Sequence, residues 1–186
     1  SQKLKNSNQK NNFIKNKEII DHSIEKAFNS KLFKQIIIVT NNLNRLKKRR
    51  YPKLIKIIKG GKERSDSSLK ALKYLKKYKP KNVFIHDAAR PNFSINLLKK
   101  ITKNMRNNKA VVPIVSSKDS IKYKVKNRVF NLKRENSILT QTPQAFRFNE
   151  LYNIAVKEKT NVTDEATLFL NQDYKIKFIT CLLYTS

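Results

Sequence analysis

A short apolar run near the middle of the chain is followed by residues suited to phosphate chemistry. Residues 83–85 predict a buried strand, and the sequence His-Asp-Ala-Ala-Arg-Pro follows it at 86–91. Asp87 could hold a magnesium ion between phosphates or accept sugar hydroxyls, and Arg90 could fork onto phosphate oxygens. The alternative is an Asp–Arg pair that only fixes the loop. His86 could act as a base, but strand-end histidines are more often packed structural residues, so we assign it no catalytic role.

The two glycines of the chain are adjacent, at Gly60 and Gly61, and the sequence Lys-Glu-Arg-Ser-Asp-Ser follows them. This pattern predicts a turn that enters a helix with hydroxyls and an arginine in reach. Free amides at such a helix start can hold an anion. The alternative is that the glycines only make a tight turn and that Ser65 or Ser67 only caps the helix. Taken alone, the glycine pair favours this second interpretation.

Two later segments contain further polar groups. Residues 140–146 read Thr-Gln-Thr-Pro-Gln-Ala-Phe, which locally predicts a proline turn, and residues 162–166 read Val-Thr-Asp-Glu-Ala, which predicts a capped helix start. Neither segment indicates a function by itself. A structural zinc site is excluded, because Cys181 is the single cysteine and the two histidines lie far apart.

The elements that must position these residues alternate between strands and helices. Predicted strands cover residues 36–39, 54–58, 83–85, 111–115 and 174–179, and predicted helices lie between them, one after a cap at Asp21 and one after a cap at Ser94. This order predicts an α/β fold with a mostly parallel, Rossmann-like sheet, helices on both faces and ligands at the carboxyl ends of the strands. Residues 121–130 alternate with lysines around a turn at 126–127, which predicts an inserted β-hairpin arm.

Length and composition indicate one globular domain over residues 1–186, since 39% of the residues are hydrophobic. We expect a cytoplasmic protein without a membrane partner, because neither a membrane-spanning stretch nor a signal-peptide pattern is present. The formal charge of +29 would suit a nucleic-acid partner. However, the lysines are spread along the whole chain among Asn and Ile, which favours biased amino-acid usage and no specific nucleic acid.

Taken in order, six segments closely resemble the 2-C-methyl-D-erythritol 4-phosphate cytidylyltransferases of isoprenoid synthesis. They are GGKERSDS, HDAARP, Pro113 with Asp119–Lys122, Lys133-Arg134, QTPQAF and TDEA, and the match covers about residues 8 to 180. The resemblance implies a reaction in which the substrate phosphate attacks the α-phosphorus of CTP and releases pyrophosphate. It also implies magnesium as the cofactor and a homodimer formed through the arm at residues 116–136.

The resemblance also implies roles for single residues, which we list by ligand. CTP would be bound by Lys3, Gly61, Lys62, Ser67 and Ala88; the sugar-alcohol phosphate by Asp87, Arg90, Arg134, Thr142 and Thr163; magnesium by Asp87; and the catalytic residues would be Lys10, Arg134 and Asp87. Arg134 would reach into the partner subunit's site. Lys62 replaces the acid common at its position.

The ends of the chain depart from the family pattern. The family begins with a strand and a glycine-rich loop that ends in arginine, where this chain has Lys3, and the following Pro-Lys-Gln segment corresponds to residues 8–10. The catalytic lysine position is therefore Gln9 or, with a shift of one residue, Lys10. Residues 181–186 match no family motif. We expect a fragment that lacks both ends of the enzyme and has impaired activity.

Two alternatives remain from the sequence. A ribitol-5-phosphate cytidylyltransferase shares much of the motif pattern, and turnover of the two sugar phosphates would separate the two enzymes. A basic nucleic-acid-binding protein would explain the charge of +29. The sequence has no aromatic and basic recognition motif to support this second alternative.

Overall fold

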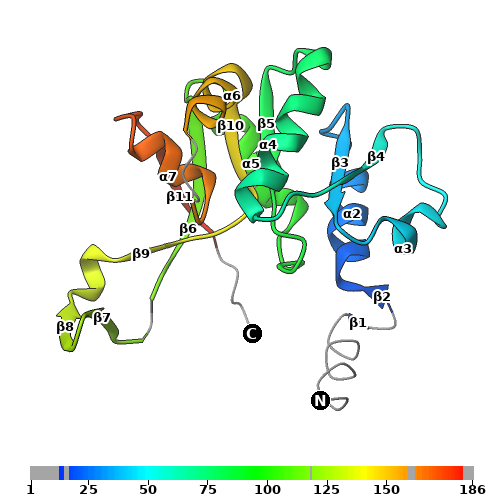
Figure 1. The fold of residues 1–186 in the computed structure, drawn as a ribbon. Coiled ribbons are helices and arrows are strands. Elements are labelled where there is room, and N and C mark those ends of the chain that lie inside the picture. Colours follow the sequence, from blue (N-terminus) through cyan, green and yellow to red (C-terminus); the bar gives the residue numbers. More distant parts are fainter. Residues whose placement is uncertain (1–12, 15–16, 118, 159–161, 182–186) are drawn as a thin grey trace.

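Most of the predicted apolar runs form strands. The computed structural model describes residues 13–14, 17–117, 119–158 and 162–181. Its largest sheet has the strand order β11-β6-β10-β5, with β9 beside β6 (Figure 1). Strand β11 is parallel to β6, and β10 is antiparallel to both β5 and β6, so β5, β6 and β11 run in one direction. These strands are β5 (Asn82–Ile85), β6 (Ala110–Ser116), β9 (Ile138–Thr140), β10 (Gln144–Arg147) and β11 (Lys177–Thr180).

A second, two-stranded sheet is parallel and has its own small core. Strand β3 (Ile36–Thr40) pairs with β4 (Ile55–Lys59). Ile24 of helix α2 (Ile19–Asn29) and Leu46 of helix α3 (Leu43–Lys47) are buried against these strands, together with Ile38 and Ile55. Because both strands of this pair end at the same edge, the loop after β4 starts close to the end of β3.

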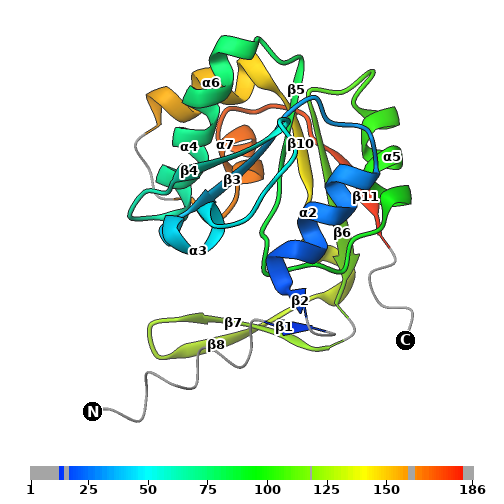
Figure 2. The ribbon, with the colours of Figure 1, turned by 90° about the vertical axis from the view of Figure 1, so that its right-hand side faces the viewer.

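Helices cover both faces of the larger sheet, as Figure 2 shows. Val112 of β6 packs in a core with α4 (Arg64–Leu75), α6 (Phe148–Lys157) and α7 (Glu165–Leu170). Its neighbour Val111 packs in the other core, with α5 (Ile95–Asn104). Adjacent residues of a strand point to opposite faces, so an unbroken apolar run is buried on both sides. The predicted α/β fold with helices on both faces is confirmed.

Helix starts agree only partly with the predicted caps. The Ser94 hydroxyl accepts a hydrogen bond from the Leu97 amide at 3.1 Å, as expected. The cap predicted at Asp21 is wrong: α2 begins at Ile19 after Glu18, and Asp21 lies in the first turn, where its carboxylate pairs with Arg49. An acid in the first turn is favoured by the helix dipole without being the cap, which explains why both positions fit the same sequence pattern.

The predicted hairpin projects from the body as a two-stranded arm (Figures 1 and 2). Strands β7 (Ile121–Val125) and β8 (Arg128–Leu132) pair through a turn in which Lys126 has a φ of 50°. A 3-10 helix, η2 (Arg134–Asn136), connects β8 to β9. The arm exposes large apolar side chains, namely Tyr123, Val125, Val129, Phe130 and Leu132.

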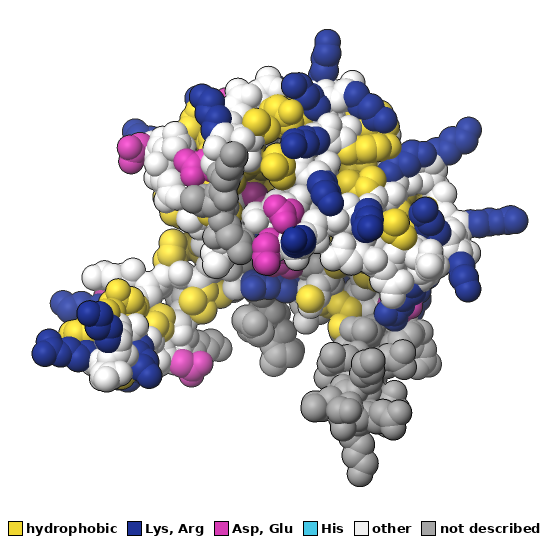
Figure 3. Space-filling model, in the orientation of Figure 1, with side chains coloured by type: hydrophobic (Ala, Val, Ile, Leu, Met, Phe, Trp, Pro, Cys, Tyr) yellow, Lys and Arg dark blue, Asp and Glu magenta, His cyan; other side chains and the backbone are white. Residues whose placement is uncertain are grey.

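The short remaining elements are a pair of two-residue strands, β1 (Phe13–Ile14) and β2 (Lys17–Glu18), and the 3-10 helix η1 (Lys76–Tyr78). Figure 3 shows lysines and arginines scattered over the visible face rather than gathered in one block. In the described part of the chain, no helix is long and apolar enough to cross a membrane.

Candidate active site

The loop after β5 and the segment before β10 meet at one edge of the sheet. Gln144 of β10 lies opposite Ile85 of β5 in antiparallel register. The residues that precede β10 therefore lie beside those that follow β5. The buried Thr142 hydroxyl accepts a hydrogen bond from the Asp87 amide at 3.3 Å. The structure thus brings together the two motifs that the sequence separates by more than fifty residues.

His86 is a structural residue of this loop. Its Nδ1 lies 2.9 Å from the Thr142 hydroxyl and its Nε2 lies 3.3 Å from the Ser23 hydroxyl on α2, and its ring packs edge-on against Phe93. Burial lowers the pKa of His86 to about 4, although the charge of Asp87 opposes this shift. A neutral imidazole with both nitrogens within reach of hydroxyls fixes the loop, which agrees with the structural role that the sequence indicated.

Asp87 and Arg90 lie together, as predicted, but their contact is loose. Arg90 Nε is 3.7 Å from Asp87 Oδ2, and Arg90 Nη1 donates to Gln141 Oε1 at 3.3 Å. Half of the Arg90 side chain is exposed, so its guanidinium can reach a ligand in solvent. Ala88, between the two charged residues, is partly buried and has a small side chain.

The glycine pair is held against the start of α4. The Ser67 hydroxyl accepts from the Gly61 amide at 3.0 Å and donates to the Glu63 carbonyl at 3.1 Å, so Ser67 fastens the loop instead of capping the helix. A Cβ on Gly61 would lie 2.1 Å from the Asp66 Cβ, so the loop approaches α4 too closely for any side chain. Lys62 is exposed.

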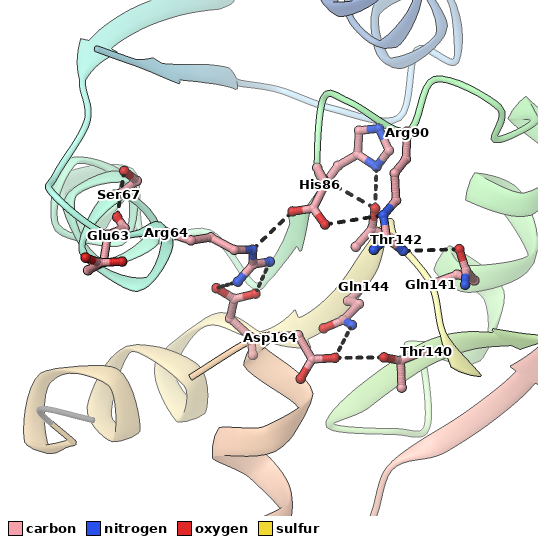
Figure 4. A network of polar contacts seen from close by, with 12 residues as sticks. Glu63, Arg64, Ser67, His86, Arg90, Thr140, Gln141, Thr142, Gln144 and Asp164 are labelled. Carbon is pink, nitrogen blue, oxygen red and sulfur yellow. Dashed lines mark hydrogen bonds and ion pairs between the residues drawn. The ribbon is translucent and has the colours of Figure 1, made fainter. Parts of the chain in front are cut away.

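Arg64, the first residue of α4, connects the glycine loop to the loop after β5 and to the start of α7. Its Nη1 and Nη2 donate to the two carboxylate oxygens of Glu165 at 3.0 and 2.9 Å, and its Nε donates to Asp87 Oδ1 at 3.1 Å (Figure 4). Burial opposes the charged form of Arg64, but the hydrogen bonds and charges of Glu165 and Asp87 outweigh it and raise the pKa of the guanidinium.

Asp164 organises the segment before α7. Its carboxylate accepts from Thr140 Oγ1 at 3.0 Å and from Gln144 Nε2 at 2.9 Å, and it caps α7 through the Thr167 amide at 3.1 Å. Burial alone would raise the pKa of Asp164, but the hydrogen bonds from Gln144, Thr167 and Thr140 lower it. The exposed Thr163 lies directly before this cap, so Asp164 fixes its backbone beside the site.

The predicted site residues divide into three groups. Asp87, Ala88, Arg90, Thr142 and the glycine loop with Ser67 lie on loops that hydrogen bonds link at one sheet edge, and Thr163 borders them. Arg134 lies in η2 at the base of the arm. Lys3, Gln9 and Lys10 lie outside the described residues. The roles assigned to all of these residues stay predictions.

Three residues that hold the loops together were not among the predicted site residues: Arg64, Asp164 and Glu165. The motifs GGKERSDS and TDEA contain them, but nothing in one sequence pairs an arginine with a carboxylate 101 positions away. The one signal in the sequence was the Asp-Glu pair at a predicted helix start. It indicated a helix cap and therefore one part of the role of Asp164.

A metal would find few protein ligands at this edge. Among the described residues, no group of three or more His, Cys, Asp or Glu side chains could hold an ion. Oδ1 of Asp87 is bound to Arg64 and Oδ2 lies 3.7 Å from Arg90 Nε, whereas both Glu165 oxygens are bound to Arg64. This donor set fits magnesium only if phosphates supply most of the ligands, which is how magnesium is commonly held in nucleotide sites.

Comparison with known proteins relates this geometry to one family. Residues 2–180 match the model of 2-C-methyl-D-erythritol 4-phosphate cytidylyltransferase, IspD. The bifunctional enzyme IspD/IspF of Pelagibacter ubique is 45% identical over 167 residues, which cover 89% of this chain and 45% of that relative. The 2-C-methyl-D-erythritol 4-phosphate cytidylyltransferase of Caldicellulosiruptor saccharolyticus is 34% identical, with coverage of 82% and 70%. The chain thus spans less than half of the bifunctional relative.

Solved structures with the same fold carry related names. The 4-diphosphocytidyl-2C-methyl-D-erythritol synthase of Anaerococcus prevotii superposes with a TM-score of 0.81 at 27% identity, covering 90% of this chain and 78% of that one. The bifunctional IspDF of Campylobacter jejuni gives a TM-score of 0.76 at 25% identity and covers 89% of this chain and 42% of that one.

Proposed function

This chain belongs to the 2-C-methyl-D-erythritol 4-phosphate cytidylyltransferase family, and on that premise we propose that its carboxyl-edge loops transfer the cytidylyl group of CTP to methylerythritol phosphate. The observation that carries the proposal is the set of hydrogen bonds in which Ser67 fixes the loop after β4 and Arg64 joins the start of α4 to the loop after β5 and to the start of α7. These loops contain the family's nucleotide-binding and substrate-binding motifs.

In the proposed reaction, a substrate phosphate oxygen attacks the α-phosphorus of CTP, the bond to the β-phosphate breaks, and pyrophosphate leaves. No covalent enzyme intermediate is needed, so the protein contributes orientation and positive charge. Gly61, Lys62, Ser67 and Ala88 hold the nucleotide, and Arg90 faces phosphate oxygens. Thr163 and the Thr142 loop border the sugar-alcohol phosphate. Thr142 itself is buried, and its hydroxyl is held by His86 and the Asp87 amide.

Magnesium, when bound, would neutralise charge on the triphosphate, and Asp87 is the residue that would hold it. Arg64 donates to one carboxylate oxygen of Asp87 at 3.1 Å, which fixes the orientation of this carboxylate beside Arg90. Additional positive charge for the phosphates comes from Arg90 on the same loop and from Lys3 and Lys10.

We further propose a cytoplasmic homodimer in which the arm of one subunit packs on its partner. Five large apolar side chains of β7 and β8 are between 41% and 62% exposed, which is costly for a projecting hairpin unless another surface covers them. Arg134, at the base of the arm, would then enter the partner subunit's site.

A coupled assay of pyrophosphate release tests the proposed reaction. The chain is supplied with CTP, magnesium and either methylerythritol phosphate or ribitol 5-phosphate. A second protein carries residues 2–180 in place of the matching segment of the Pelagibacter ubique relative. We expect release with methylerythritol phosphate in the second protein and a higher kcat/KM than with ribitol 5-phosphate. Absence of release from both proteins, or a preference for ribitol 5-phosphate, would overturn the proposal.

A further inference from the structure

Arg64 links three segments that lie far apart in the sequence. It is the first residue of α4 and follows the glycine pair. It reaches Asp87 after β5 and Glu165 at the start of α7. Each of these segments carries residues of the proposed site, so the guanidinium of Arg64, which belongs to the first segment, joins it to the other two.

The direction of the Arg64 side chain is set by Glu165. The Glu165 side chain is only 2% exposed, and a carboxylate removed from water needs a paired cation with good hydrogen-bond geometry. Nη1 and Nη2 of Arg64 supply that pairing to both oxygens at 3.0 and 2.9 Å. A planar guanidinium fixed on two nitrogens has no freedom left for the third. Its Nε therefore faces Asp87 Oδ1 at 3.1 Å.

We propose that Arg64 is the positioning residue of this site: anchored on buried Glu165, it holds Oδ1 of Asp87 and so fixes the orientation of that carboxylate beside Arg90. The inference rests on the proposed function and adds to it a residue that acts through Asp87. Arg64 does not need to touch the substrate in this role. Lysine cannot replace it, because one ammonium group cannot donate in parallel to Glu165 and also reach Asp87.

If Arg64 positions Asp87, replacing Arg64 should change the geometry of the site and not only the stability of the fold. A matched substitution at another arginine separates these two effects. Arg147 is also a partly buried arginine, and it donates to Asn82 at 3.0 Å and to the Arg106 carbonyl at 2.9 Å. It lies at the end of the β5–β10 pair opposite to Asp87, since Arg147 is paired with Asn82 in register. Arg147→Lys therefore loosens the same strand pair without touching the site.

The experiment compares Arg64→Lys, Glu165→Gln and Arg147→Lys with the unsubstituted protein by two readouts. Hydrogen exchange followed by mass spectrometry reports on the loop at 86–91, and steady-state turnover gives kcat and KM. For Arg64→Lys and Glu165→Gln we expect faster exchange at 86–91 and a kcat lowered about 10- to 100-fold, the range associated with small misplacements of catalytic groups. KM for CTP should change less than kcat.

The result that overturns the inference is an Arg64→Lys protein whose exchange at 86–91 and kcat resemble those of Arg147→Lys. Absence of turnover in both the unsubstituted protein and the residue 2–180 replacement protein would instead count against the proposed function. Exchange at 86–91 still decides the role of Arg64 in that case, because it is measured without substrate. Faster exchange in both site variants supports the role of Arg64 in holding Asp87, and unchanged exchange refutes it.

Discussion

At the scale of single residues, the polar groups of the site bind mainly to one another. The His86 ring contacts the hydroxyls of Thr142 and Ser23. The Asp164 carboxylate accepts hydrogen bonds from Thr140 and Gln144. Buried polar groups are costly unless they are paired, so such networks allow few alternative arrangements. The loops thus have defined positions although they are not regular structure.

His86 should make the protein sensitive to mild acid. Its pKa is lowered to about 4 in the folded state from 6.5, so the unfolded chain binds a proton first as the pH falls. Stability from this group is complete above pH 6.5 and is lost between pH 6.5 and 4, by about 3 kcal/mol in total. Denaturant unfolding at pH 7 and pH 4.5 should show a smaller loss for His86→Gln than for the unsubstituted protein. An equal loss of unfolding free energy in the two proteins would contradict the lowered pKa of His86.

The two glycines should respond differently to a methyl group. Gly61→Ala places a Cβ 2.1 Å from the Asp66 Cβ and 3.0 Å from the Asp66 carbonyl carbon, whereas Gly60→Ala meets only the ends of the Asn41 and Ser67 side chains at 2.8 and 3.0 Å. Overpacking costs about 1–3 kcal/mol, so Gly61→Ala should lose that much in unfolding free energy and Gly60→Ala less. The reverse order in thermal unfolding would show that the loop can move away from α4.

At this scale the sequence predicted which residues cluster, but not all the contacts that hold them. Asp87 and Arg90 were expected together because they share one strand end. The Arg64–Glu165 pair was not, because 101 residues separate its members and a single sequence contains no record of which charges meet.

At the scale of elements, the continuous β-branched runs and the alternating hairpin were predicted as strands, but the strand β10 was not. Residues 36–40 form β3 as expected. Strand β10, which includes Gln144 and Arg147, was taken for part of a proline turn. Its buried position arises from pairing with β5 and β6, a tertiary effect that local patterns do not contain. The short α3 was missed because its five residues are too few for a helical period to be recognised.

The arm should determine the oligomeric state. Val129 of β8 is 62% exposed, and Val129→Lys would place a charge in the proposed interface. We expect sedimentation velocity to show a dimer for the unsubstituted protein and mainly monomer for the variant, with reduced turnover because Arg134 no longer reaches its partner. Val156→Lys, a similar change at a 46% exposed position of α6, is the control. Dimers that persist in Val129→Lys would exclude the arm as the interface.

At the scale of the whole molecule, the polar network at one sheet edge accounts for the proposed function better than the net charge does. The charge of +29 is the most conspicuous property of the sequence, but lysines and arginines are scattered over the face seen in Figure 3. The polar network, in contrast, lies at one edge, where loops from both sheets meet. A scattered charge raises non-specific affinity for polyanions without defining a site.

The most direct test of the account follows the α-phosphate of CTP. The experiment supplies CTP labelled at that phosphorus, methylerythritol phosphate and magnesium to the residue 2–180 replacement protein and to its Asp87→Asn form. Our account predicts that the label enters a CDP-linked methylerythritol product in the first protein. It predicts a rate lower by about 100-fold or more in the second, while thermal unfolding stays similar. Label transfer at the same rate in both proteins, or in neither, would contradict it.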